Sequence, residues 1–447
     1  MITRHFLTIP ASAGAPERRV HYRKCGSGPA LLLVHQSPRS AKEYEALMRQ
    51  WGAHFTCIAP DSPGFGQSSP LHGEPDIDAF AAATLQFLDC LGIKHCHAYG
   101  FHSGGIILAH AMKQQPRRFT ALAIGGYPVW TEAEMALFGE RYTVPFRPSA
   151  YGEHLTWLWN RVLEQSWFFP WFDVRDETRM SVAHADLARV QAIVMEMLDA
   201  GDAYRAGYRA ALSAPPWVAP EAMQTGPVLI SAYDGDPLQA HIDRLPALPS
   251  GWRTARVPGP AAHLATCLAF LRSHPAADCP ALAEDHAEGF IALGAGLIHW
   301  RGTMGARRLV LHAPGAELAD PGPEAIAIDV PGHGLSDGVE RLADALDAIR
   351  AQLGTDRPVL PQPPAGDPDM LYPDLAPQRF GEHLLRAWGL SRAEALFAPW
   401  YEANAAHAIP VIPSAITPEA IALRTRARLR AGNAARQWHD ALVKMQP

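Results

Sequence analysis

The run of residues 99–105 reads YGFHSGG and contains the pattern Gly-x-His-x-Gly. A Gly-x-nucleophile-x-Gly pattern is typical of a sharp strand-to-helix turn that exposes its central side chain. Gly100 and Gly104 lie two places before and after His102, so neighbouring backbone can pass close to both. Centred on Ser103, the pattern would place a phenylalanine at the first small position. The spacing therefore predicts that His102 occupies the position of the attacking residue.

A histidine at this position is already a base, with an ordinary pKa of about 6.5. Three chemistries are open. His102 attacks a carbonyl and forms an acyl-imidazole, with His263 and Asp236 behind it, or His102 and His263 act as general bases on water or substrate in hydrolysis, retro-aldol or retro-Claisen cleavage. In the third alternative the site has lost its chemistry and only binds. Ser103 is a further candidate nucleophile, but we expect its side chain to point toward the start of the helix.

Alternating strand and helix patterns position this turn. Residues 30–34 are an apolar run typical of a buried parallel strand, and a helix pattern follows from 40 to about 50. A second strand precedes the Gly- and Pro-rich turn at 61–69, and residues 76–93 have apolar side chains at helical spacing, with Asp76 or Asp78 near the start as cap. This order predicts an α/β fold, in which helices wrap a mostly parallel sheet.

Four motifs, taken in order, resemble those of the α/β-hydrolase family over about residues 15 to 275. They are HQSP at 35–38, DSPGFGQS at 61–68, GPVLISAYDGDPL containing Asp236, and VPGPAAHLATCLAFL containing His263. The resemblance implies an α/β-hydrolase fold with a helical cap at about 132–218. It also implies that Asp236 is the acid and His263 the histidine of a catalytic triad variant. Asp234 is the rival acid, but Asp236 directly precedes a proline, as the acid of the family does.

The same resemblance implies an oxyanion hole made by the backbone N–H groups of Ser37 and Ser103. Gln36 stands where the family usually has glycine, which adds a polar side chain at the mouth of the pocket. Arg39 is a candidate ligand for a substrate carboxylate. Trp171 belongs to an aromatic-rich stretch that forms either the core of the cap or an apolar substrate pocket.

Composition narrows the class of protein. The chain has 447 residues, of which 48% are hydrophobic and 19% charged. Its formal net charge is −6, and the sequence contains no run of basic residues. The charge argues against nucleic acid as partner. The start of the sequence lacks the apolar core of a signal peptide and no apolar stretch reaches about 18 residues, so we expect a soluble, cytoplasmic protein without a membrane partner. The expected partner is a small-molecule substrate. The six cysteines lack paired spacing, and the histidines lack metal-ligand spacing, so we expect neither a metal site nor a cofactor.

The second half of the chain repeats motifs of the first. IHWR at 298–301 corresponds to VHYR at 20–23, and IAIDVPGHGLS ending at Ser336 corresponds to IAPDSPGFGQS ending at Ser68. FGEHL at 380–384 corresponds to YGEHL at 151–155. The second copy is shorter between these motifs, where the first copy contains the elbow, and it ends before any counterpart of Asp236 or His263.

We therefore predict two domains. The first, 1–273, is an α/β-hydrolase domain, and the second, 286–447, is a truncated, degenerate copy with cap-like helices at about 372–443, joined by a linker near 274–285. We expect the copies to form a pseudo-dimer within one chain, and further oligomerisation is possible. The leading function is cofactor-independent cleavage of a small apolar or aromatic carbonyl compound at an ester, amide or C–C bond. The alternative is a non-catalytic ligand-binding or scaffolding protein.

Overall fold

The computed structural model describes residues 1–12, 14–181, 183–283 and 287–445. The chain divides into two compact units, the first made of residues 1–146, 163–185 and 196–284 and the second of 147–162, 186–195 and 285–447. Residues 285 and 286, where the predicted linker ends and the second predicted domain begins, lie outside the described residues. The predicted domain boundaries remain a prediction.

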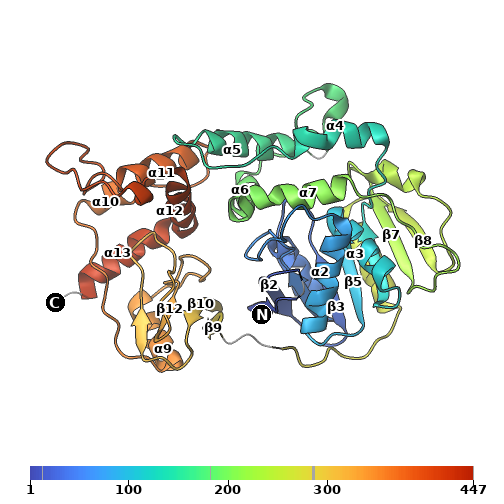
Figure 1. Ribbon diagram of the computed structural model, residues 1–447, viewed down its shortest axis with the longest axis horizontal. Coiled ribbons are helices and arrows are strands. Elements are labelled where there is room, and N and C mark those ends of the chain that lie inside the picture. The colour runs from blue at the N-terminus through green and yellow to red at the C-terminus, as the bar shows by residue number, and fades with distance from the viewer. Residues whose placement is uncertain (13, 182, 284–286, 446–447) are drawn as a thin grey trace. The chain divides into compact units, whose positions relative to one another are not determined.

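The first unit contains an eight-stranded sheet with the order β1-β2-β4-β3-β5-β6-β7-β8 (Figure 1). From β4 through β8 neighbouring strands are parallel, whereas β2 pairs antiparallel with both β1 and β4. The fold is therefore α/β with a mostly parallel sheet, as predicted. The strands are β1 (Thr3–Ile9), β2 (Arg18–Cys25), β3 (Ala30–Val34), β4 (Thr56–Pro60), β5 (Cys96–Phe101), β6 (Phe119–Gly125), β7 (Val228–Tyr233) and β8 (Trp252–Val257).

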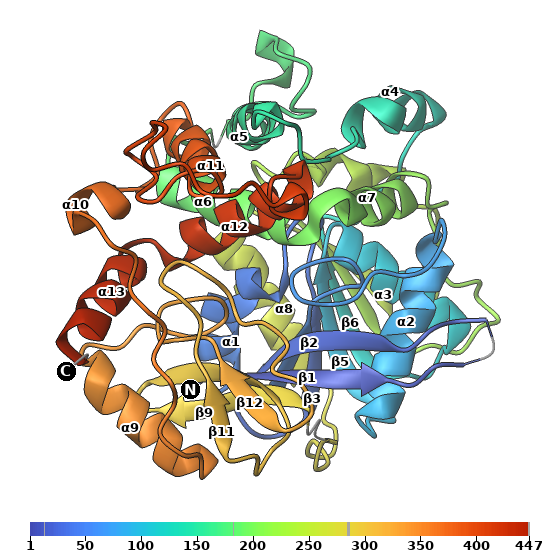
Figure 2. The same ribbon diagram turned by 60° about the vertical axis from the view of Figure 1, so that its left-hand side comes forward.

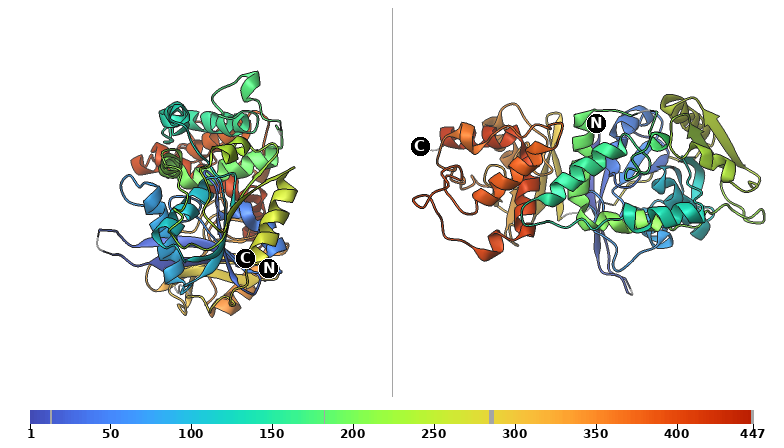
Figure 3. Two further views of the ribbon diagram at one scale, coloured as in Figure 1. Left: turned by 90° about the vertical axis from the view of Figure 1, so that its right-hand side faces the viewer. Right: turned by 90° about the horizontal axis from the view of Figure 1, so that it is seen from above.

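Helices cover both faces of this sheet (Figure 3). Successive side chains of a strand point to opposite faces, so Leu32 of β3 joins one core and Leu31 and Leu33 join the other. Helices α2, α3 and α7 pack in the first core and α1 and α8 in the second. The helices with residues in this unit are α1 (Glu45–Trp51), α2 (Ile77–Cys90), α3 (Ser103–Gln114), α4 (Glu132–Tyr142), the end of α5 (Glu153–Gln165), α6 (Leu187–Ala200), α7 (Tyr204–Leu212) and α8 (Pro260–Arg272).

The second unit contains a four-stranded sheet with the order β11-β12-β10-β9 (Figure 2). Its strands are β9 (Glu288–Leu293), β10 (Gly296–Gly302), β11 (Arg308–Val310) and β12 (Ala325–Ile328). β10 pairs antiparallel with β9 and β12, and β11 pairs parallel with β12. The order and directions equal those of β3-β4-β2-β1 in the first sheet. No strand follows β12 among the described residues, and the helices are α9 (Leu342–Leu353), α10 (Pro368–Leu371), α11 (Glu382–Ala393), α12 (Pro418–Ala431) and α13 (Asn433–Met445).

Each sheet contains a buried His–Asp–Ser hydrogen-bond network with nearly the same geometry. In the first unit, Nδ1 of His21 lies 2.8 Å from Oδ2 of Asp61, and the His21 amide donates to Oγ of Ser68 over 3.0 Å. The corresponding distances from His299 to Asp329 and Ser336 are 2.8 Å and 2.9 Å. The two sheets therefore share buried polar contacts as well as strand order.

Helices α5 (Glu153–Gln165) and α11 pack side by side through reciprocal contacts (Figures 1 and 2). The ring of His154 lies edge-on to Trp388 at 4.9 Å, and that of His383 lies edge-on to Trp159 at 5.0 Å. The glycine that precedes each helix, Gly152 or Gly381, lies against the tryptophan of the other helix. No helix in the described part of the chain is long and apolar enough to cross a membrane.

Candidate active site

The sequence run at 99–105 folds into a strained turn between β5 and α3. His102 lies between the last residue of β5 and the first of α3, with φ 47° and ψ −116°. Among the described residues it is the single non-glycine residue with positive φ, a conformation that L-residues adopt at a cost. A Cβ on Gly104 would lie 2.0 Å from the carbonyl oxygen of Val34, and one on Gly100 would lie 2.6 Å from Gly104. The two flanking glycines are thus required by backbone contact.

The imidazole of His102 is hydrogen-bonded directly to Asp236. Nε2 of His102 lies 3.0 Å from Oδ1 and 3.2 Å from Oδ2 of Asp236, which follows the carboxyl end of β7. Oδ1 also accepts the backbone N–H of Leu238 over 2.8 Å. The side chain of Asp236 is fully buried, whereas that of His102 is 21% exposed. Burial favours the neutral acid, but His102 and the Leu238 amide outweigh it and hold the pKa of Asp236 below its ordinary value.

The other contacts of His102 leave one edge of its ring available. The ring stacks on Phe101 with centroids 4.0 Å apart, and its Cδ2–Nε2 edge lies against Gly126. Because a carboxylate only accepts, Nε2 carries the proton that is donated to Asp236. Nδ1 then has the lone pair, and no hydrogen bond to it is formed by the described residues.

His263 lies in a different environment from the one that the resemblance implied. It lies in the first turn of α8 and is 1% exposed, with Nδ1 3.0 Å from Oγ of Ser231 and Nε2 2.9 Å from the hydroxyl of Tyr99. Burial lowers the pKa of His263 to about 4, although Asp236 opposes this shift. Within the described chain, no hydrogen bond joins it to His102 or Asp236. Asp236 is hydrogen-bonded to His102 instead.

The predicted oxyanion groups lie close together, but the Ser37 amide already has a partner. It donates to Oγ of Ser103 over 2.7 Å, and this hydroxyl lies 3.3 Å from Oγ of Ser37. The Ser103 side chain therefore points at the predicted oxyanion hole rather than only along the helix. Its backbone amide lies at the first position of α3, where the helix dipole favours negative charge.

Gln36 and Arg39 belong to a buried polar network. The side chain and amide of Gln36 donate to the two carboxylate oxygens of Glu43, over 3.2 and 3.0 Å. Arg39 forms an ion pair with Glu196 of α6 and lies 3.6 Å from Glu43, and Ser40 donates to Glu196 over 2.8 Å. Arg39 is thus occupied by two carboxylates, which leaves it poorly suited to a substrate carboxylate.

The other residues that the sequence singled out lie outside the His102–Asp236 contact. Trp171 packs edge-on against Phe172, with ring centroids 5.5 Å apart, within the aromatic-rich stretch. Asp234, the rival acid, is exposed and hydrogen-bonded to Gln239. In the residues that the structure describes, no group of three or more His, Cys, Asp or Glu side chains could hold a metal ion.

Sequence reasoning missed Glu196, Ser231 and Tyr99. Glu196 is an ordinary helical glutamate in sequence, and only folding brings it to Arg39, 157 positions away. Ser231 and Tyr99 lie inside apolar strands, and the motifs that contain them pointed to Asp236 and His102 instead. Their side chains point to the face that α8 covers, and strand alternation predicts that face only once the position of α8 is known.

Residues 29–137 match the α/β hydrolase fold family. Haloalkane dehalogenase 2 of Mycobacterium tuberculosis is 30% identical over 120 residues, which cover 27% of this chain and 42% of the dehalogenase. An uncharacterized hydrolase of Saccharomyces cerevisiae is 30% identical over 107 residues, or 23% of this chain and 37% of its own. The matched segment therefore spans less than half of these relatives. Among solved structures, a thermophilic esterase from Thermogutta terrifontis has a TM-score of 0.42 at 18% identity, covering 60% of this chain and 97% of the esterase.

Proposed function

From the α/β-hydrolase fold that residues 29–137 carry, we propose that this chain is a cofactor-independent hydrolase or lyase that acts on a small carbonyl compound. The observation that carries the proposal is the 3.0 Å hydrogen bond from Nε2 of His102 to Asp236 at a strained elbow. A buried, ionised carboxylate fixes the tautomer and stabilises the imidazolium that forms when the other nitrogen takes a proton.

We propose general-base catalysis by Nδ1 of His102. In hydrolysis, Nδ1 removes a proton from water while the oxygen of that water attacks the carbonyl carbon. The imidazolium then returns the proton to the leaving group. For C–C cleavage of a hydrated diketone or an aldol, the same nitrogen removes the hydroxyl proton as the carbon–carbon bond breaks, and the imidazolium then protonates the carbon of the enolate that leaves.

The surroundings of His263 favour this role over an acyl-imidazole. Hydrolysis of an acyl group on His102 would need a second general base to activate water. The imidazole of His263 is the residue that the family resemblance offers for this role. That ring is buried and both of its nitrogens are engaged, by Tyr99 and Ser231. General-base catalysis needs only the His102–Asp236 pair.

Charge that develops on the substrate oxygen would be stabilised by the amide of Ser103 and the helix dipole behind it. The Ser37 amide contributes when the Ser103 hydroxyl rotates away or is displaced by the substrate oxygen. We therefore propose a role for both predicted oxyanion amides, with the Ser103 side chain as an internal occupant of the hole.

The decisive experiment compares turnover of p-nitrophenyl acetate and of a β-diketone by the wild type, His102→Ala and His72→Ala. His72 is exposed and lies outside the site, so its variant controls for loss of any histidine. We expect His102→Ala to lower kcat by about a hundredfold or more. Equal rates in the wild type and His102→Ala would refute the proposal.

One observation favours the second candidate, a non-catalytic ligand-binding protein. The 2.7 Å hydrogen bond from the Ser37 amide to Ser103 fills part of the oxyanion hole in the free protein. If this bond persists with ligand, charge stabilisation is lost and only binding remains. Thermal stabilisation by a diketone without turnover would identify this case.

For the second unit we propose a degenerate copy of the first. Support comes from the shared strand order, the matching His21 and His299 networks, and the reciprocal packing of α5 with α11. The absence of any described strand after β12 means that this unit offers no elbow. We propose that the contact between α5 and α11 reproduces within one chain a symmetric contact between two cap helices.

A further inference from the structure

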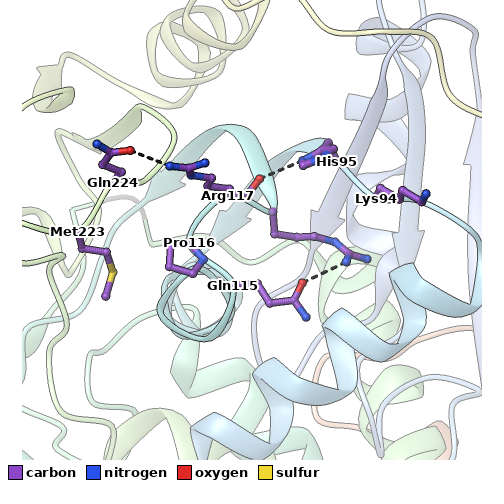
Figure 4. A pocket seen from close by; sticks show the side chains of 8 residues that line it. Lys94, His95, Gln115, Pro116, Arg117, Met223 and Gln224 are labelled. Carbon is purple, nitrogen blue, oxygen red and sulfur yellow. Dashed lines mark hydrogen bonds between the residues drawn. The ribbon is translucent and has the colours of Figure 1, made fainter.

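A pocket of about 580 Å³ lies at the end of the first sheet opposite to His102. Figure 4 shows the side chains that line it. Residues 94–95 directly precede β5, residues 115–118 join α3 to β6, and Met223 and Gln224 lie shortly before β7. Because β5, β6 and β7 are adjacent and parallel, their amino ends meet at one edge of the sheet. His102 follows the carboxyl end of β5, about 20 Å away along a six-residue strand.

The pocket is positively charged although the chain as a whole is not. Its lining contains Lys94, Arg117 and Arg118 together with His95, and none of its eight lining residues is acidic. The chain has a formal net charge of −6, so this concentration of cations does not follow from composition. A basic concave surface raises the local concentration of anions.

Arg118 gives this pocket a built element. It is 8% exposed, and its Nη atoms bind Gln115, the carbonyl of Ile93 and Asp89. Its buried Nε–H has no hydrogen-bond partner among the described residues. An unpaired buried donor of a charged group is costly unless a ligand or water satisfies it.

The other basic side chains of the pocket have N–H groups that remain available to a ligand. Arg117 uses one Nη2 contact, of 2.7 Å, with Gln224, as Figure 4 shows, and its guanidinium has further N–H groups. His95 donates from Nδ1 to the carbonyl of Arg117 over 3.0 Å, which leaves Nε2 to face solvent or ligand. Met223 and Pro116 add apolar surface beside these groups.

We propose that this pocket binds a small organic anion, a carboxylate or phosphate monoester with an apolar body. The guanidinium groups match the planar arrangement of carboxylate or phosphate oxygens, and Lys94 adds a point charge. The apolar body packs against Met223 and Pro116. The volume is within the range of small-molecule sites. This site is separate from the His102 site and does not depend on the function proposed for it.

The test is isothermal titration calorimetry of the full chain with phenyl phosphate, phenylacetate and the neutral benzyl alcohol. We expect one or both anions to bind, benzyl alcohol to bind much more weakly, and added salt to weaken the binding of the anion. The preferred anion identifies the head group. Absence of binding for both anions, or equal binding of benzyl alcohol, would overturn the proposal.

Variants locate the site. The double variant Lys94→Gln/Arg117→Gln changes exposed side chains only, so we expect it to fold and to weaken the binding of the anion by about tenfold or more. Lys42→Gln removes an exposed charge elsewhere in the same unit and should bind like the wild type. His102→Ala should also keep full affinity, which separates this site from the elbow. Unchanged affinity in the double variant, or equal losses in either control, would place binding elsewhere.

Discussion

Nε2 of His102 and Oδ1 of Asp236 lie 3.0 Å apart, although 134 positions separate the two residues in the chain. The carboxylate therefore reaches the elbow histidine directly, without an intervening imidazole. His263, which the resemblance placed between them, is hydrogen-bonded to Tyr99 and Ser231 instead. His102 and Asp236 therefore form a histidine–carboxylate pair at a strained turn.

Asp236→Asn should lower kcat by about 10³- to 10⁴-fold, because an amide can donate to Nε2 and reverse the tautomer that keeps Nδ1 basic. Steady-state kinetics on the best p-nitrophenyl ester or diketone measures this. Asp234→Asn is the matched control, since Asp234 is exposed and lies two positions earlier. A kcat near the wild-type value for Asp236→Asn would contradict a role for the pair.

Ser103→Ala should retain or raise kcat. It removes the hydroxyl that occupies the Ser37 amide and leaves the backbone donors in place. If Ser103 were the nucleophile, the same change would abolish turnover. Ser37→Ala is the matched control, because it removes the neighbouring hydroxyl but keeps the hydrogen bond from the Ser37 amide to Oγ of Ser103.

Gly126→Ala should lower kcat by about a hundredfold, because small displacements of catalytic groups are costly. Its added Cβ would lie 2.5 Å from Cδ2 of His102 and 2.6 Å from Oδ2 of Asp236. Gly201 has φ 54°, close to the 55° of Gly126, but no atom within 4 Å of an added Cβ. Gly201→Ala therefore has a similar backbone cost without displacing the pair, and equal activity of the two variants would show that the clash is harmless.

The first unit should lose stability on acidification partly through His263. Its pKa is lowered to about 4 in the folded protein by burial, against about 6.5 in an unfolded chain, so the unfolded chain binds the proton first. The stability that depends on neutral His263 is complete above about pH 6.5. It falls by up to about 1.4 kcal/mol per pH unit as pH decreases toward about 4.

His263→Gln can still hydrogen-bond but does not titrate, so the pH dependence of its unfolding free energy should be shallower than that of the wild type. Urea unfolding at pH 7 and pH 5 measures the difference. Parallel pH dependences for both proteins would mean that other groups account for the acid sensitivity.

The contact between α5 and α11 should be energetically asymmetric. Nε1 of Trp159 donates to the carbonyl of Arg379 over 2.9 Å, whereas the buried Nε1 of Trp388 has no partner among the described residues. Trp159→Phe should therefore cost about 1–2 kcal/mol more of unfolding free energy than Trp388→Phe. The two substitutions remove the same atoms, so each controls the other in urea unfolding, and equal losses would refute the asymmetry.

His102→Ser tests how far the site departs from a serine triad. The imidazole of His263 is hydrogen-bonded to Tyr99 and Ser231, so a serine at position 102 would lack a general base. The observed geometry therefore predicts that His102→Ser hydrolyses p-nitrophenyl acetate no faster than His102→Ala, and restored esterase activity would contradict this arrangement.

Local patterns sufficed for much of the fold. The apolar run at 30–34 coincides with β3, and Asp76 caps α2 through the amide of Ala79, as its position before a helical pattern suggests. The elbow was also readable, because its glycine spacing is a local pattern, although the backbone that leaves no room for a Cβ at Gly104 is that of Val34 in β3. These features depend on local spacing and on side-chain periodicity, which a single sequence carries.

By itself, the sequence determined that an α/β sheet presents His102 at a glycine-flanked turn, and it showed the recurring motifs of the second half. Only the tertiary structure decided which acid and which histidine reach that turn. Asp236 and His263 both lie in motifs that resemble those of the family. The fold brings Asp236 to His102, but it buries the ring of His263 between α8 and the sheet. The same holds for Arg39, whose partner Glu196 is 157 positions away. Such pairings depend on packing between distant elements, and local sequence does not encode them in a readable form.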